Sequence, residues 1–104
     1  MTSLQHQVAN WHIDRERLDE WESIWDQMHD VARQTPGFRT ARLLRSVEHP
    51  GKYTIYSLWD SRASWVEYYN TSKVQELIHS SFRLLKGPPV TEWFDLVREV
   101  HVTG

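Results

Sequence analysis

The residues best suited to chemistry gather in one stretch, residues 52–70, whose pattern is that of a strand, a sharp turn and a short helix. The helix carries Trp65, Tyr68 and Tyr69, whose rings can stack on a flat ligand while their N–H and O–H groups orient its oxygens. Their i, i+3, i+4 spacing also suits ordinary packing in a core. The stretch therefore predicts either the lining of a small-ligand cavity or an aromatic core, and both interpretations stay open.

Polar residues elsewhere in the chain could complete such a site. Asn10 lies in an otherwise apolar strand, where an unpaired amide is costly, so it either faces a cavity or makes a structural hydrogen bond. His79 lies beside the apolar stripe of a later helix and could accept a proton near neutral pH, or simply face solvent. The remaining candidates for contact with a ligand are His12, Trp59, Phe82 and Arg83. A core position for Trp59 and a solvated or ion-paired position for Arg83 are the competing interpretations.

Size and composition limit the classes of function. A chain of 104 residues makes one domain, spanning 1–104. Its net charge of −2 provides no field to attract nucleic acid. The sequence has no cysteine, which excludes disulfides and thiolate metal sites and is compatible with the cytoplasm. It begins without a signal peptide and has no run of ~18 apolar residues, so we expect a cytoplasmic protein with neither a membrane nor a nucleic acid as partner.

Hydrophobic periodicity predicts the elements that must position these residues. In chain order they are a strand at 4–13, a helix at 15–34, strands at 38–47 and 52–59, a helical region that follows residue 61, restarts at residue 71 or 72 and ends near 85, and a strand at 90–102. Asp14 is the expected N-cap of the first helix, and Asp60 or Ser61 that of the second. The turn at 48–51 joins two strands into an antiparallel hairpin.

This β-α-β-β-α-β order predicts an α+β, ferredoxin-like fold with a four-stranded antiparallel sheet and helices on one face. The strand at 52–59 has Tyr53, Ile55 and Trp59 on one face and Tyr56 and Leu58 on the other. Apolar residues on both faces indicate that both are covered. A second copy of the chain is the economical cover, so we expect a homodimer.

Several segments together resemble a known family. They are the first strand with its acidic turn, and the segments 34–38 (QTPGF), 42–46 (RLLRS), 58–61 (LWDS) and 69–72 (YNTS). The chain resembles the antibiotic biosynthesis monooxygenase domain, a group of small dimeric α+β barrels, over most of its length. The resemblance implies oxygenation of an aromatic or polyketide-type molecule by O₂, of the phenol-to-quinone type, without metal or flavin. In that case Asn10 and Tyr69 orient the substrate oxygens, Trp65 and Tyr68 flank its ring, and His79 accepts the proton.

Two alternatives remain open. Haem-degrading relatives of this fold have an asparagine on the first strand and an axial histidine on a later helix, for which Asn10 and His79 are the counterparts. Tyr68 stands where those enzymes have a tryptophan, and the spacing to His79 is one residue longer, so the chain departs from that pattern. The other alternative is a non-catalytic barrel that binds a small hydrophobic molecule.

Overall fold

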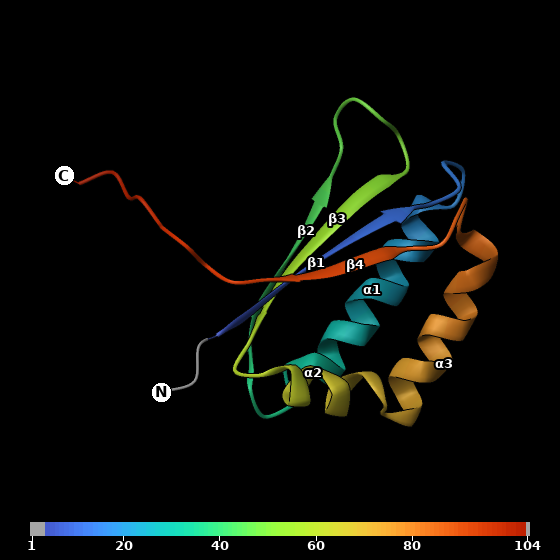
Figure 1. The fold of residues 1–104 in the computed structure, drawn as a ribbon. Coiled ribbons are helices and arrows are strands. Elements are labelled where there is room, and N and C mark those ends of the chain that lie inside the picture. The colour runs from blue at the N-terminus through green and yellow to red at the C-terminus, as the bar shows by residue number, and fades with distance from the viewer. Residues whose placement is uncertain (1–3, 104) are drawn as a thin grey trace.

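The computed structural model describes residues 4–103 and has the predicted order of elements (Figure 1). The elements are β1 (Gln5–His12), α1 (Leu18–Ala32), β2 (Phe38–Arg45), β3 (Lys52–Trp59), α2 (Arg62–Tyr69), α3 (Ser72–Ser81), the short 3₁₀ helix η1 (Phe82–Leu84) and β4 (Val90–Phe94). The strands form one antiparallel sheet in the order β2-β3-β1-β4. The prediction of an α+β, ferredoxin-like fold is confirmed.

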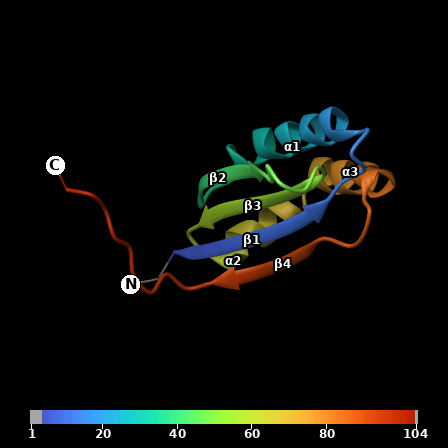
Figure 2. The ribbon, with the colours of Figure 1, turned by 90° about the horizontal axis from the view of Figure 1, so that it is seen from above.

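The three α-helices lie on one face of this sheet, and the other face is open (Figure 2). Side chains alternate along β1 and β3, so every second residue of each strand enters the core beneath the helices. Trp21 of α1 and Trp59 of β3 are fully enclosed there. The alternate residues of β1 and β3, such as Val8 and Tyr56, point to the open face. None of the helices found in residues 4–103 is long and apolar enough to cross a membrane.

Helix starts depend on local hydrogen bonds. Ser61 caps α2 by accepting from the Ser64 N–H, and Thr71 caps α3 by accepting from the Val74 N–H, as predicted for these positions. The prediction for Asp14 is wrong. Its carboxylate accepts from the Glu16 N–H at 3.1 Å within a turn, and α1 begins only at Leu18. The extra turn moves the cap position three residues along the chain.

Close packing at a glycine fixes the chain between α1 and β2. Gly37 has φ +93°, a conformation that residues with a Cβ atom rarely adopt. A Cβ atom at this position would lie 2.2 Å from the Ser64 Oγ of α2. Glycine is therefore required both for the turn and for the close approach of α2, the helix that carries the aromatic candidates.

The last strand is shorter than the predicted 90–102, because β4 ends at Phe94. Phe94 pairs with His6, and β1 begins only one residue before His6. Beyond Phe94 the chain therefore has no neighbouring strand with which to form a ladder. Residues 95–103 continue as an extended arm that leaves the body of the protein (Figure 1). The radius of gyration, 14.6 Å, exceeds the ~13 Å of a compact chain of this length, consistent with the arm.

Candidate functional site

A partly open hollow of about 80 Å³ lies between the helix-covered face of the sheet and the helices. Its lining is mostly aromatic and aliphatic, and it includes the side chains of two residues that hydrogen-bond to each other, Gln7 and Ser57. The lining residues are Gln7, Ala9, Trp11, Met28, His29, Ile55, Ser57, Trp59, Trp65, Tyr68, Tyr69, Ile78 and Thr91. An apolar hollow with a few convergent polar groups is the usual form of a small-molecule site.

Two side chains of β1 that line this hollow carry buried hydrogen-bond donors without a protein partner. Trp59 Nε1 donates to Ser57 Oγ at 3.1 Å, and Ser57 Oγ donates to Gln7 Oε1 at 3.1 Å. These two hydrogen bonds hold the Gln7 amide in place and occupy its oxygen as an acceptor. The Gln7 side chain is only 6% exposed. No described residue accepts from Gln7 Nε2 or from Trp11 Nε1, and both atoms are buried; the same holds for Nε1 of Trp21 and Trp25, which do not line this hollow. A buried donor without a partner is costly, so two such donors in one hollow indicate a place for a ligand oxygen.

His29 of α1 supplies an imidazole to the lining of the hollow. Its Nδ1 lies 2.9 Å from the Trp25 carbonyl oxygen, which can only accept, so Nδ1 carries the proton. In the neutral ring Nε2 is then the basic atom. Burial lowers the pKa of His29 below its ordinary value of 6.5, although the bond to Trp25 acts in the opposite direction. The ring is therefore mainly neutral at pH 7.

Aromatic side chains of α2 form one wall of the hollow. The rings of Trp65 and Tyr69 lie 4.7 Å apart, and Trp65 meets Trp93 of β4 edge-on at 5.6 Å. Arg62 lies over the Trp93 ring, 5.4 Å from its centroid, which adds a cation–π contact. Burial strongly raises the pKa of Tyr68, so its phenol stays protonated. With this wall in place the hollow is well below the ~300–1,000 Å³ of a typical ligand pocket.

Comparison with known proteins identifies the family. The family model described as antibiotic biosynthesis monooxygenase matches residues 5–80, which is most of the chain. The chain belongs to the antibiotic biosynthesis monooxygenase family. The match includes every strand and helix from β1 to α3 apart from the last residue of α3. The predicted resemblance is thus confirmed. A search among curated proteins gives no match.

Several solved structures share the fold. A protein from Caulobacter crescentus that carries the family's name is 20% identical, with a TM-score of 0.86 over 93% of this chain and 92% of that one. A second, from Nitrosomonas europaea, is 10% identical, with a TM-score of 0.85 over 93% of each chain. SnoaB, a cofactor-independent oxygenase from Streptomyces nogalater, is 14% identical, with a TM-score of 0.83 over 94% of this chain and 97% of its own. At these identities the likeness concerns the fold alone.

The structure brings together four of the residues that the sequence nominated for this family member. Trp59, Trp65, Tyr68 and Tyr69 all line the hollow. Trp59 and Tyr68 are also part of the core, with ring centroids 5.2 Å apart, so the two interpretations of these residues, core or cavity wall, both describe their position. Trp65 and Tyr69 are only partly buried and form the outer wall.

Two nominated residues of β1 lie on the opposite side of the sheet. Asn10 is on the open face, where its Oδ1 accepts from Thr54 Oγ1 at 2.7 Å. This is the structural hydrogen bond that the sequence left as its alternative to a cavity position. His12 is exposed at the end of the same face. The expectation that Asn10 and His12 share a cavity with the aromatic residues of α2 is not met, because the hollow lies on the other face.

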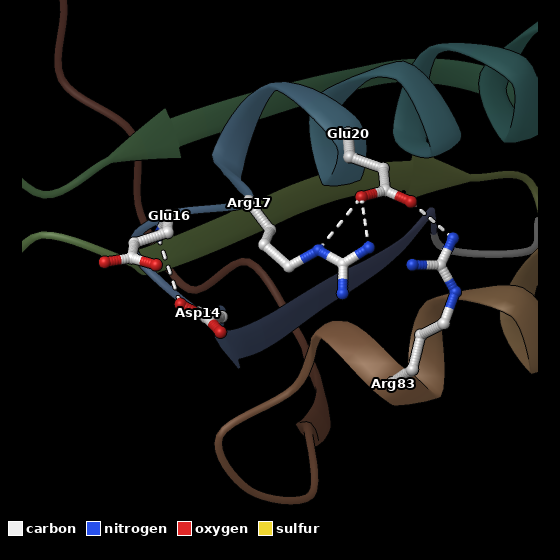
Figure 3. A network of polar contacts seen from close by, with 5 residues as sticks. All are labelled: Asp14, Glu16, Arg17, Glu20 and Arg83. Atoms are coloured by element: carbon white, nitrogen blue, oxygen red, sulfur yellow. Dashed lines mark hydrogen bonds and ion pairs between the residues drawn. The ribbon is translucent and has the colours of Figure 1, made fainter.

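The nominated residues after α2 also lie outside the hollow. His79 is exposed on α3 and meets the ring of Phe82, itself 55% exposed, at a centroid distance of 5.8 Å. Arg83 is ion-paired with Glu20 of α1, which also pairs with Arg17 at 2.7 Å (Figure 3). The hydrogen bond from Arg83 is the largest cause that lowers the pKa of Glu20, and the one from Arg17 is the next. Arg83 is therefore ion-paired at the surface, which was the competing interpretation of this residue.

The residues present do not fit haem at the predicted ligand. His79 faces solvent and does not border the hollow, whereas the preceding residue, Ile78, lines it. His79, the predicted axial ligand, therefore does not support the haem alternative. In residues 4–103, no three His, Asp or Glu side chains converge in a way that could hold a metal ion.

Sequence reasoning missed Gln7 and His29, although each left a signal. Gln7 shares a strand face with Ala9 and Trp11, so it is a polar amide at an apolar position. His29 comes four residues after Trp25 and directly after Met28, at the edge of the apolar stripe of α1. In both cases the informative feature is a polar side chain at a position where the hydrophobic repeat of the strand or helix predicts an apolar one.

Proposed function

We propose that this family member is a cofactor-independent monooxygenase that converts a phenol- or anthrone-type aromatic to a quinone in the hollow beneath α2. The observation that supports this most is the pair of unpartnered buried donors, Gln7 Nε2 and Trp11 Nε1, in an aromatic hollow. Donors fixed in advance and shielded from water stabilise a developing oxyanion. The donor chain from Trp59 through Ser57 holds the Gln7 amide in place.

The chemistry balances without an external reductant. Loss of a proton turns the substrate into an electron-rich anion, held by the donors of Gln7 and Trp11. The anion gives one electron to O₂, and the resulting radical pair joins through a new C–O bond to give a peroxide. Cleavage of the O–O bond with loss of a second proton from carbon gives the quinone and water. For anthrone this is C₁₄H₁₀O + O₂ → C₁₄H₈O₂ + H₂O, so the substrate supplies all the electrons.

Substrate entry on this proposal requires the aromatic wall to move. The hollow as it stands has room for O₂ or a few water molecules, because a water needs only ~10–15 Å³ of such volume. A bicyclic phenol needs more. Trp65 and Tyr69 are partly exposed and lie on a helix of eight residues, so their rotation outward is the economical way to enlarge the hollow. Their rings would then flank the substrate.

Oxygen uptake tests the proposed reaction. With anthrone or 1-naphthol as the probe and no added reductant, we expect consumption of one O₂ for each quinone formed, faster than in the protein-free solution. An oxygen electrode and the absorbance of the quinone measure the two quantities. Oxygen uptake at the protein-free rate for both probes, with the probes bound, would contradict an oxygenase and favour a binding protein.

We also propose that the working form is a homodimer in which two open sheet faces pack together. The open face carries a broad hollow of about 950 Å³. Its lining includes apolar side chains of β1, β2 and β3, of the residue before β1 and of the arm, namely Val8, Leu44, Leu58, Leu4 and Leu96. Beyond it the arm exposes three valines almost fully, Val97, Val100 and Val102. A second copy would remove this apolar surface from water at ~25 cal/mol per Å².

A further inference from the structure

We propose that His29 is the catalytic base, and that its ring exchanges protons with solvent through a second hollow, between α1 and β2. This inference rests on the proposed function, since it names the group that removes the substrate proton. It depends on the position of one side chain at the border between two hollows.

The contacts of the ring fix which nitrogen is basic and hold its orientation. Nδ1 donates to the Trp25 carbonyl at 2.9 Å, which leaves the lone pair on Nε2. The Trp25 ring stacks on the imidazole at 3.9 Å, and the rings of Phe38 and Tyr68 lie 6.5 and 6.4 Å away. A base that is held in one tautomer and one orientation needs no rearrangement before it accepts a proton.

The same ring borders both hollows. On the inner side His29 shares the lining with the donors of Gln7 and Trp11. On the outer side it lines an open hollow of about 480 Å³, together with residues of α1 and β2. A group that moves protons between a dry cavity and water must be accessible from both. His29 is the one titratable residue that the linings of these two hollows have in common.

Charged groups around the ring come from three directions. Asp26, Asp30 and Arg33 lie on α1, and Asp30 and Arg33 form an ion pair. Arg39 at the start of β2 lines the outer hollow and is paired with Asp60 at 2.5 Å. α2 presents the protonated phenol of Tyr68, and the sheet presents the uncharged Gln7 and Ser57. The charges thus largely cancel, and burial remains the main cause of the lowered pKa of His29.

The proton balance closes with His29 as the only base. Nε2 takes the first proton from carbon and gives it to the peroxide oxygen once the C–O bond has formed. It then takes the second proton from carbon as the O–O bond breaks, and that proton joins the departing hydroxide to make water. The ring returns to its neutral state, and no proton has to leave the protein. Exchange through the outer hollow nevertheless lets solvent deuterium reach the substrate, which provides a test.

Anaerobic deuterium exchange measures the base step without oxygen. In D₂O under argon, we expect the protein to accelerate deuterium incorporation at C10 of anthrone. His29→Asn keeps an N–H that can donate to the Trp25 carbonyl but has no basic atom, so we expect it to lose about 10²-fold or more of this acceleration. His49→Asn, the same change at an exposed turn residue, should exchange like the unmodified protein.

The same preparations in air separate the two proposals. Oxygen uptake that persists in His29→Asn at the unmodified rate would overturn the role of His29 and leave the oxygenase intact. Deuterium exchange that depends on His29 without oxygen uptake would support the base and overturn the oxygenase. Exchange at the rate of the protein-free solution would overturn the role of His29 in either case.

Two measurements on the unmodified protein keep the test independent of whether the variant folds. The ¹⁵N NMR spectrum should show His29 as the neutral Nδ1–H tautomer at pH 7, and its Nε2 signal should shift when 1-naphthol binds. The exchange rate should fall as the pH drops through the lowered pKa of His29, below 6.5, because only the free imidazole acts as a base. An Nε2–H tautomer, or an Nε2 signal that does not move when 1-naphthol binds, would overturn the proposal.

Discussion

Replacing Gln7 by methionine is expected to lower kcat for oxygen uptake by about 10²- to 10³-fold, the usual effect of removing one donor to an oxyanion. Methionine has a similar length and keeps the hollow filled, but it has no N–H. The Gln7 amide is buried and fixed by Ser57, so solvent cannot replace its donor. KM should change less than kcat, because the charge on the substrate oxygen is largest in the transition state. Initial rates of oxygen uptake with anthrone give both constants.

The matched control is the same substitution two residues earlier on the strand. Gln5 does not border the hollow, so Gln5→Met should keep the rate within a few-fold. Thermal unfolding of both variants checks that the fold is intact, since Gln7→Met also removes a hydrogen bond worth about 1 kcal/mol. Asn10→Leu separates the two assignments for β1. If Asn10 orients the substrate, Asn10→Leu should lower the rate of oxygen uptake more than Gln7→Met does. The position of Gln7 in the hollow predicts that Gln7→Met lowers it more.

Leu44→Arg is expected to convert a dimer into a monomer. Leu44 is 54% exposed in the single chain and borders the hollow on the open face of the sheet, next to Arg42. A two-fold interface would contain the new charge twice. Burying each arginine without a partner costs roughly 2 kcal/mol or more, about 4 in total, which raises the dissociation constant by about three orders of magnitude. Light scattering after size exclusion measures the mass over a range of concentrations.

Val66→Arg is the matched control for this interface. Val66 is 45% exposed on α2, on the helix side of the sheet, and lies one helical turn from Arg62. The variant should keep the mass of the unmodified protein. A monomeric unmodified protein at micromolar concentration, or a dimeric Leu44→Arg, would contradict the proposed packing of open faces.

The order of elements was predictable because each boundary has a local cause. Ser61 and Thr71 end irregular segments with a side-chain oxygen that caps the next helix. Gly51, with φ +90°, makes the hairpin turn between β2 and β3. Alternation along β3 identifies its two faces correctly, and the buried residues Tyr53, Ile55 and Trp59 share one of them. These signals act over four or fewer residues and do not require knowledge of the tertiary structure.

The site was less predictable because the missing information is tertiary. Alternation separates Gln7 from Asn10 but does not tell which face the helices cover when both are apolar. On α3 each residue turns by about 100°, so Ile78 borders the hollow and His79 faces solvent. The arm at residues 95–103 has strand-like alternation, but a strand also needs a neighbour, and β1 does not extend far enough. Each of these errors concerns a choice that only the assembled fold makes.

The most direct test of the central claim is where a ligand binds. In a ¹H–¹⁵N NMR titration with 1-naphthol, we predict the largest shifts for the Gln7 side-chain amide and the Trp11 indole N–H, which have no partner among residues 4–103. Such shifts would place the ligand oxygen in the hollow beneath α2. Shifts confined to the Asn10 side chain and its neighbours on the open face, with the Gln7 signal unchanged, would contradict the account.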